Sequence, residues 1–289
     1  MNFNDSPKIL IVGLGLMGGS YAQALTDAGY EVGAVARRAE TIDYALSRGL
    51  IRHGRSSIDP DYLGQFDLIV FALYPHIFLQ WLAENQDYLK SGALLTDVTG
   101  VKGRVVYEVQ RLLRKDCEFI AAHPMAGREV SGVENADKSI FLGANYLVTP
   151  TAANTPHAVS VCMELGRILG FRTVTTLSPE EHDEMIGFLS QLTHCIAVAL
   201  MTCKESRHLV DYTGDSFRDL TRIAKINDEM WSELFLLNKD ELLSQMDLFA
   251  EKFSELRDCI ARGDIPALRE MMRLSTQRRK YFDEGGKRS

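Results

Sequence analysis

Residues 8–18 have the sequence KILIVGLGLMG, in which an apolar run leads directly into the spacing Gly-x-Gly-x-x-Gly. The apolar part is typical of a buried strand, and helical spacing begins at Gly18. In such a strand–turn–helix, Gly13 permits the tight turn, Gly15 lets the backbone approach a pyrophosphate, and Gly18 allows close packing of the helix on the strand. The stretch predicts a dinucleotide-binding α/β domain, and a glycine turn without a ligand is the alternative.

The start of the helix after this turn should take part in cofactor binding. A helix N-terminus presents free backbone N–H groups and the positive end of the helix dipole to a phosphate. We therefore expect Leu16 and Met17 in the first turn to bind the cofactor along with the glycines. Leu73, which ends a later apolar run, and Thr99, in the loop after the next run, complete the predicted set of cofactor-binding residues.

The end of the second predicted strand bears on the choice of nicotinamide cofactor. NAD enzymes usually place Asp or Glu there, to accept hydrogen bonds from the ribose 2′-OH. This chain has Ala36 followed by Arg37 and Arg38, and no carboxylate at that place. Arginine pairs well with a 2′-phosphate, so we expect NADP to be preferred over NAD. The alternative is a pair of solvated arginines in a surface loop.

Short apolar runs alternate with segments of helical spacing through the first half of the chain. The runs are Lys8–Gly13, Glu31–Ala36, Asp67–Leu73, Ala93–Val98 and Phe119–Ala122. Near-continuous apolar strands separated by helices indicate a Rossmann-type, doubly wound and mainly parallel sheet with helices on both faces. Tyr146–Thr149 and Phe171–Leu177 are predicted as two further strands, on either side of a helix from about Pro156 to Leu169.

The pattern changes at Ser178. The sequence Ser178-Pro179-Glu180-Glu181 combines an N-cap serine, a proline at the first helical position and a glutamate at the third, which is a capping box. Only helical patterns follow it. We therefore expect a dinucleotide-binding domain over residues 1–177 and an all-helical substrate and dimerisation domain over residues 178–289.

One apolar stripe stands out in the helical half. Its members are spaced by three and four residues, and Gly263 follows where a C-cap belongs. They are Met246, Phe249, Phe253, Leu256 and Ile260. The stripe fits either intrachain core or a seam between subunits, and the sequence alone favours core.

Composition limits the class of protein. The chain has 289 residues, 46% of them hydrophobic and 25% charged, with a formal net charge of −7. That charge argues against nucleic-acid binding, because no basic surplus is available to neutralise phosphates. Neither a signal peptide nor an apolar run of about 18 residues is evident, so we expect no membrane association. Five scattered cysteines without a CxxC pair favour free thiols in a reducing cytoplasm.

Two loops that leave predicted strands contain polar residues of the kinds that take part in catalysis or ligand binding. Residues 96–102 are TDVTGVK, and residues 121–132 are AAHPMAGREVSG. Both follow the carboxyl ends of strands, where open α/β sheets bind their ligands. Further polar motifs lie downstream, with EHD at 181–183, SQLTH at 190–194 and FRDLTRIA at 217–224.

These motifs together resemble those of the prephenate/arogenate dehydrogenase family. The family has a D-x-x-S-V-K-like loop, an H-P-M-A-G-like loop, an S-H-L-P-H-like segment and an F-x-D-x-T-R-I-A-like segment in this order. The resemblance runs from about Lys8 to Asn238. It implies an NAD(P)-dependent oxidative decarboxylation of prephenate or arogenate in tyrosine biosynthesis, by a cytoplasmic homodimer whose helical domain forms the subunit contact.

The resemblance also implies roles for three residues. His123 corresponds to the catalytic histidine, which would draw off the hydroxyl proton as hydride leaves the same carbon. Arg222 would bind a substrate carboxylate with its planar guanidinium group, and His194 would contact substrate. The alternatives are a strand-end histidine bonded to a backbone carbonyl, an arginine in a surface ion pair, and a buried structural histidine. We predict no metal site.

The remaining predicted substrate contacts include positions that depart from the family pattern. They are Thr99, Gly100, Glu129 and Ser190. Gly100 stands where many members have a serine that hydrogen-bonds beside the catalytic histidine, and the neighbouring Thr99 is a candidate to supply that hydroxyl. Glu129 is equally an acidic residue at the pocket mouth or an ordinary solvated one.

Other departures bear on the choice of substrate. Gln191 and Thr193 replace the family's His and Pro, and we expect both to touch the substrate pocket. Lys102 either orients its loop or is simply exposed. Two other classes of protein remain as alternatives, namely another two-domain dehydrogenase of the β-hydroxyacid or imine-reducing type, and a dinucleotide-binding regulator without activity.

Overall fold

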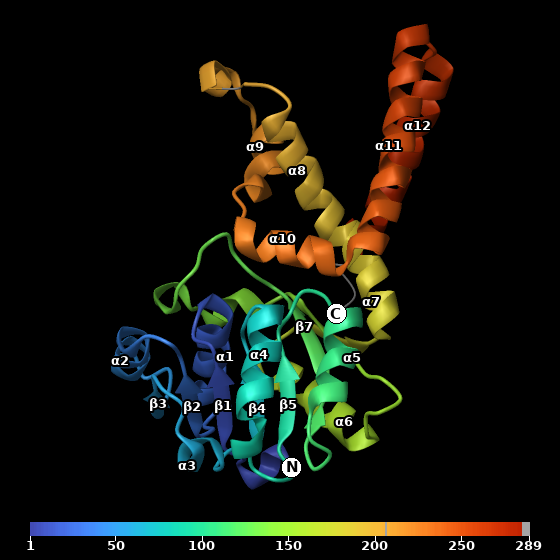
Figure 1. The fold of residues 1–289 in the computed structure, drawn as a ribbon. Coiled ribbons are helices and arrows are strands. Elements are labelled where there is room, and N and C mark those ends of the chain that lie inside the picture. Colours follow the sequence, from blue (N-terminus) through green and yellow to red (C-terminus); the bar gives the residue numbers. More distant parts are fainter. Residues whose placement is uncertain (206, 285–289) are drawn as a thin grey trace. The chain divides into compact units, whose positions relative to one another are not determined.

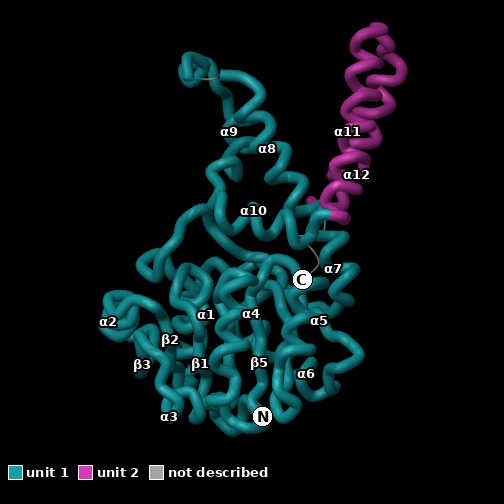
Figure 2. Tube along the Cα trace, viewed as in Figure 1, with its two compact units in different colours: residues 1–239 teal, residues 240–289 magenta. Residues whose placement is uncertain are grey.

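The computed structural model describes residues 1–205 and 207–284 (Figure 1). By compactness these residues fall into two units, residues 1–239 and residues 240–289 (Figure 2). The glycine loop and all of the predicted site residues belong to the first unit. Each unit is described by itself below.

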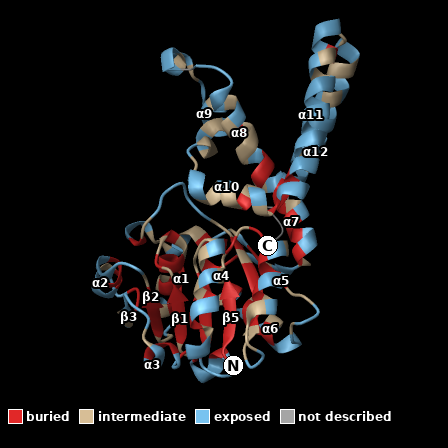
Figure 3. Ribbon diagram, in the orientation of Figure 1, coloured by how far each residue is buried: buried red, intermediate tan, exposed pale blue. Residues whose placement is uncertain are grey.

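A six-stranded parallel sheet forms the centre of the first unit, with the order β3-β2-β1-β4-β5-β6. Its strands are β1 (Ile9–Val12), β2 (Val32–Val35), β3 (His53–Arg55), β4 (Leu68–Phe71), β5 (Leu94–Asp97) and β6 (Glu118–Phe119). The connecting helices are α1 (Leu16–Asp27), α2 (Ala39–Ser47), α3 (Pro60–Leu63), α4 (Pro75–Asn85) and α5 (Gly103–Leu112). Strands β1, β2, β4 and β5 are buried throughout, as their apolar runs predicted, and this confirms the doubly wound parallel sheet (Figure 3).

A second, three-stranded sheet follows, and the sequence did not separate it from the first. It consists of β7 (Ala121–Met125), β8 (Asn145–Thr149) and β9 (Thr173–Thr176), with α6 (Pro156–Ile168) between the last two. Strand β7 pairs antiparallel with β8, and β9 pairs parallel with it. The prediction of one strand over Phe119–Ala122 is therefore wrong. The run contains the end of β6 and the start of β7. Because both ends are buried and apolar, the sequence shows no boundary between the two strands.

Strand β3 was missed because it is short and polar. Its sequence His53-Gly54-Arg55 has no apolar run, and it is placed by hydrogen bonds to β2 and by the Tyr62 hydroxyl, which lies 3.0 Å from His53 Nδ1. Tyr62 also bonds to Ala34 of β2. An edge strand of this kind is stabilised by contacts with its neighbours, so its own residues need not show the apolar pattern of a buried strand.

Helices make up the rest of the described chain. In the first unit these are α7 (Pro179–Ile186), a π-helical segment (Gly187–Leu192), α8 (Thr193–Thr202), α9 (Asp215–Thr221) and α10 (Asp228–Leu237). The second unit consists of α11 (Lys239–Arg262) and α12 (Ile265–Glu284). The capping box at the start of α7 is present, with Ser178 and Glu181 each accepting a hydrogen bond from the other's backbone N–H. The all-helical second half is thus confirmed.

The helical stretch Pro179–Thr202 is long and apolar enough to cross a membrane by length and composition, which the sequence did not suggest. These two criteria are weak evidence here. The first turns of the stretch bury His182 and Asp183, and Asp183 bonds to the backbone of α5 and its N-cap residue. These contacts join the start of the stretch to the α/β part.

The apolar stripe on α11 does not form intrachain core. Phe253 and Ile260 keep 61% and 62% of their surface exposed, and Met246 and Phe249 are also exposed. Most of α11 is coloured as exposed in Figure 3. The interpretation that the sequence favoured is therefore wrong for the single chain. The alternative, a seam between subunits, explains why a helix would keep an apolar stripe facing outward.

Candidate active site

The glycine loop between β1 and α1 leaves no room for side chains at its first and third positions. A Cβ on Gly13, whose φ is +97°, would lie 2.4 Å from the carbonyl oxygen of Ala72, and one on Gly18 would lie 1.9 Å from the carbonyl oxygen of Gly13. A Cβ on Gly15 would meet nothing within 4 Å. The outer glycines are thus needed for backbone packing, and the middle one borders open space at the N-terminus of α1, as a pyrophosphate site requires.

The other predicted cofactor contacts lie around this loop. Leu16 is buried in the first turn of α1, and Met17 is half-buried beside it. The side chain of Leu73 packs against Gly13. Arg37 and Arg38 are exposed after the end of β2, and Arg38 is the N-cap of α2. Because β1 is paired with both β2 and β4, the carboxyl ends of these three strands, and so the glycine loop, the arginines and Leu73, lie side by side.

A fully buried ion pair lies at the end of β5. Lys102 Nζ donates to Asp97 Oδ2 at 2.7 Å, to the Ala122 carbonyl at 2.5 Å and to Thr99 Oγ1 at 3.2 Å, and neither charged side chain has exposed surface. Asp97 Oδ1 accepts from the Ala122 backbone N–H at 3.1 Å. Burial lowers the pKa of Lys102, and the Asp97 carboxylate opposes that shift. The pair therefore joins the end of β5 to the start of β7.

His123 lies within β7, and one of its ring nitrogens has a protein partner. Nδ1 lies 2.8 Å from Nε2 of His182, and Nδ1 of His182 lies 2.8 Å from Oδ1 of Asp183. His182 and Asp183 are buried, whereas His123 is only half-buried. Burial, with His182 and Lys102 nearby, holds the pKa of His123 well below its usual value, so the ring is neutral near pH 7.

Thr99 does not supply a hydroxyl to His123, which corrects that expectation. Its Oγ1 donates to the Asp97 carboxylate and lies 3.1 Å from the Val101 carbonyl, and the residue is buried. Gly100 is better placed, because a Cβ there would lie 3.9 Å from the His123 ring and 3.4 Å from Leu234. Gly100 thus offers the His123 ring no hydroxyl group.

His194 lies directly after a π-helical segment, a feature that is frequent at functional sites. Its Nδ1 is 2.9 Å from the carbonyl oxygen of Ser190, so Ser190 holds the ring through its backbone. The ring lies against Trp231, with 3.8 Å between centroids and 30° between planes. Burial lowers the pKa of His194. Sequence reasoning missed Trp231, because no spacing or motif marks it.

Arg222 lies at the end of α9 and forms an ion pair with Glu129, from the loop after β7. The Arg222 side chain is exposed, and the Glu129 side chain keeps about a third of its surface. Both charges also influence the pKa of His194, which places the three side chains in one neighbourhood. The structure thus brings Glu129, Arg222 and His194 together.

Helix α10 connects this polar group with His123. Its Trp231 contacts His194, and Leu234, one turn later, is the side chain nearest to Gly100. Its N-cap residue Asn227 bonds to Tyr74, and Glu233 in the middle of the helix bonds to His76; both partners follow β4. Figure 1 shows α10 across the carboxyl ends of the strands. The polar candidates therefore border the same end of the sheet as the glycine loop.

Comparison with known proteins places the chain. The model described as "Prephenate dehydrogenase, nucleotide-binding domain" matches residues 21–174, and "Prephenate dehydrogenase, dimerization domain" matches residues 178–274. The chain belongs to the prephenate dehydrogenase family. A prephenate dehydrogenase of Lactococcus lactis subsp. cremoris is 30% identical over 97% of this chain and 76% of its own length. A cyclohexadienyl dehydrogenase of Zymomonas mobilis is 28% identical over 94% of each chain.

Solved structures agree with the assignment. The prephenate dehydrogenase of Aquifex aeolicus superimposes with a TM-score of 0.88 at 30% identity, over 96% of this chain and 98% of that one. The match to the nucleotide-binding domain begins at residue 21, after the glycine loop, so the cofactor loop itself is assigned by its geometry.

Two residues that depart from the family's pattern do not serve the substrate pocket in the way that the sequence suggested. The amide of buried Gln191 donates to the Leu234 carbonyl at 3.0 Å and accepts from Asn238 at 2.8 Å. Thr193 is exposed, and its hydroxyl donates to the carbonyl of Ser190. Gln191 thus braces α10 against the π-helical segment.

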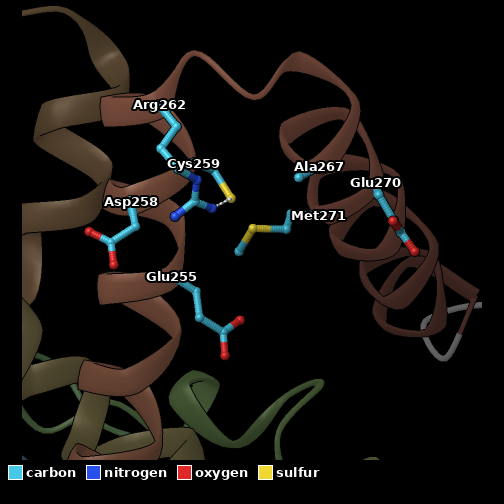
Figure 4. Close-up of a pocket in the computed structure, with 7 residues that line it drawn as sticks. All are labelled: Glu255, Asp258, Cys259, Arg262, Ala267, Glu270 and Met271. Carbon is cyan, nitrogen blue, oxygen red and sulfur yellow. Dashed lines mark hydrogen bonds between the residues drawn. The ribbon is translucent and has the colours of Figure 1, made fainter.

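A pocket elsewhere in the chain contains none of the site residues. It lies between α11 and α12 and is lined in part by Glu255, Cys259, Arg262 and Met271 (Figure 4). Arg262 bonds to the sulfur of Cys259 across its edge. Among the described residues, no group of three or more His, Cys, Asp and Glu side chains is arranged to hold a metal ion.

Removing one partner of the buried ion pair should destabilise the protein strongly. Lys102→Met leaves the Asp97 carboxylate buried without its cation, and we expect a loss of about 3–5 kcal/mol in the free energy of unfolding, measured by urea denaturation. The surface pair Lys90–Asp67 provides the control, because Lys90→Met should cost no more than about 1 kcal/mol. Equal losses in the two variants would contradict the central role of the buried pair.

Proposed function

We propose that this protein catalyses the oxidative decarboxylation of prephenate or arogenate, with hydride transfer to NADP+, in the biosynthesis of tyrosine. The observation that supports this most is the placement of His123. It lies half-buried at the ligand-binding end of the sheet, with Nδ1 partnered by His182, in a chain of the prephenate dehydrogenase family. The Aquifex aeolicus relative was solved with hydroxyphenyl propionate, an aromatic acid, and NAD+.

In this mechanism His123 acts as the general base. The substrate ring has a carbon bearing OH and H, opposite a quaternary carbon that bears a carboxylate. The neutral imidazole accepts the hydroxyl proton while the hydride leaves the same carbon. The C–O bond becomes a carbonyl, the bond to the carboxylate breaks as carbon dioxide, and its electron pair completes the aromatic ring. The low pKa of His123 keeps the base unprotonated at neutral pH.

The polar group around Arg222 binds the substrate. The guanidinium group of Arg222 is exposed and offers paired donors to a carboxylate. His194, with Nδ1 engaged by the Ser190 carbonyl, presents Nε2 to the substrate, and Trp231 supports the ring from one side. Glu129 holds Arg222 in place before substrate binds. Gly100 contributes by the space that it leaves beside His123.

The cofactor residues follow from the same geometry. The loop of Gly13, Gly15 and Gly18 and the first turn of α1, with Leu16 and Met17, would hold the pyrophosphate, and Leu73 borders it. Arg37 and Arg38 would pair with the 2′-phosphate, which gives the preference for NADP. The bound nicotinamide ring supplies the hydride acceptor.

The proposed reaction is tested by absorbance at 340 nm with purified protein, crossing prephenate and arogenate with NAD and NADP. We expect NADPH to form with at least one of the acids, with one carbon dioxide released for each NADPH. NADP should give the higher kcat/KM. No reduced cofactor in any combination, from protein shown to bind the cofactor, would contradict the proposal.

The same assay tests the two arginines. Arg37→Ala/Arg38→Ala should raise KM for NADP about tenfold or more, as expected when a charged hydrogen bond worth 1.5–3 kcal/mol is lost, and leave KM for NAD nearly unchanged. Arg48→Ala, at the other end of α2, is the control. An equal change for both cofactors would show that the pair is only part of a solvated surface.

Replacing the proposed base should remove most of the activity and leave cofactor binding intact. His123→Asn is expected to lower kcat by about 10²–10⁴-fold, the range for a positioned acid–base group. His157→Asn changes an exposed histidine on α6 and should keep normal turnover. Near-normal kcat in His123→Asn would require the mechanism to be abandoned.

Arg222→Ala should act mainly on substrate binding. We expect KM for the acid to rise by about 10- to 100-fold, because a charged hydrogen bond contributes about 1.5–3 kcal/mol, with a smaller change in kcat. The control is Arg218→Ala, one turn earlier on α9, whose guanidinium pairs with Asp215. If both variants raised KM equally, Arg222 would belong to the surface charge of α9 and not to the substrate site.

We further propose that residues 178–289 form the substrate and dimerisation domain of a cytoplasmic homodimer. The exposed stripe of α11 and the match to a dimerization-domain model support this. Sedimentation at micromolar concentration should give twice the 32.4 kDa mass of the chain. Phe253→Asp should shift the protein toward monomer, and Lys252→Asp should not. A wild-type monomer would contradict the proposal.

A further inference from the structure

We propose that His182 is a positioning residue that holds the proton of His123 on Nδ1, so that Nε2 of His123 is left as the acceptor for the substrate hydroxyl. The inference rests on the proposed function, in which His123 is the base. It adds a residue that does not touch substrate but determines which nitrogen of the base is free. It follows from two hydrogen bonds that run in one direction, from His123 through His182 to Asp183.

The chain of hydrogen bonds starts at Asp183. Its Oδ1 accepts from the backbone N–H of Lys102 at 2.8 Å, and its Oδ2 accepts from the backbone N–H of Gly103 at 2.7 Å. These amides belong to the N-cap and first residue of α5, so the carboxylate also lies at the positive end of the helix dipole. A backbone N–H can only donate and a carboxylate can only accept, which fixes Asp183 as the acceptor end.

The direction of the next two bonds follows from this. Nδ1 of His182 lies 2.8 Å from Asp183 Oδ1 and must carry the proton of that bond. A neutral imidazole has one N–H, so Nε2 of His182 presents a lone pair. That lone pair faces Nδ1 of His123 at 2.8 Å, which must therefore carry a proton in turn. Burial lowers the pKa of both rings, in agreement with neutral forms.

The opposite tautomer of His123 would be unfavourable. With the proton on Nε2, the lone pairs of His123 Nδ1 and His182 Nε2 would face each other in a buried place, at a cost of the order of an unmade buried hydrogen bond. Gly100, where a Cβ would lie 3.9 Å from the ring, offers no side chain as a substitute. Among the described residues, His182 is the hydrogen-bond partner of the His123 ring.

The tautomer can be measured without any turnover. Nitrogen-15 shifts of the imidazoles in the free protein, above the pKa of His123, distinguish protonation at Nδ1 from protonation at Nε2. The chain has seven histidines, and the spectrum of His123→Asn identifies the signals of His123. We expect Nδ1–H. Protonation at Nε2 would overturn the inference while leaving the proposed reaction intact, and an inactive protein with Nδ1–H would overturn only the reaction.

Kinetics provide the second readout. His182→Leu offers no acceptor and should lower kcat by about 10- to 100-fold, the usual effect of losing a group that orients a functional histidine, with KM for the acid and binding of NADP nearly unchanged. His182→Gln can place an amide oxygen where Nε2 lies, and it should restore most of kcat. His157→Leu is the control for a histidine outside the site.

Two results would overturn the inference. One is a folded His182→Leu variant with unchanged kcat. The other is an equal loss in the leucine and glutamine variants, accompanied by a fall in NADP binding, because that pattern indicates a purely structural residue. If His182→Leu failed to fold, the glutamine variant and the nitrogen-15 spectrum of the wild-type protein would still decide.

Discussion

The buried ion pair of Lys102 and Asp97 is the interaction on which the site depends. Asp97 ends β5 of the parallel sheet, and the pair holds both the N–H and the carbonyl of Ala122, the residue before His123. The same charges fix the loop that contains Gly100. A buried pair is stable only when its hydrogen bonds are complete, so the loop and the start of β7 can adopt few other arrangements.

A network of hydrogen bonds extends from this pair into the helical part of the first unit. The backbone of Lys102 and Gly103 donates to Asp183 of α7, and Asp183 holds His182 against His123. The carbonyl of Asp183 accepts from Asn238, which also bonds to Gln191. Helix α10, held by these residues, contributes Trp231 and Leu234. His123, His182 and α10 thus share one polar network.

Much of this could be predicted from the sequence, for identifiable reasons. The glycine loop, the capping box at Ser178 and the buried strands are local patterns, and each was found where the residues indicated it. The glycine loop, the two arginines and Leu73 lie side by side because the parallel strands β1, β2 and β4 end at one edge. The break between β6 and β7 was not predictable, because both strands are apolar and only the pairing separates them.

Contacts between residues that are far apart in the sequence could not be predicted from it. From the sequence, Lys102 could either orient its loop or be exposed to solvent. Only the fold shows that its side chain is fully buried. His182 belonged to a motif that carried no assigned role, and its partner His123 is 59 residues away. The stripe on α11 has the spacing of a core helix, and spacing cannot tell an intrachain partner from a second subunit.

The most direct test of this account is the crystal structure of the protein with NADP+ and a product-like hydroxyphenyl acid. The account predicts that Nε2 of His123 lies within about 2.6–3.2 Å of the ring hydroxyl, with Nδ1 still bonded to His182 and the acid's carboxylate on Arg222. A hydroxyl bound by another side chain, with His123 turned away from it, would contradict the account.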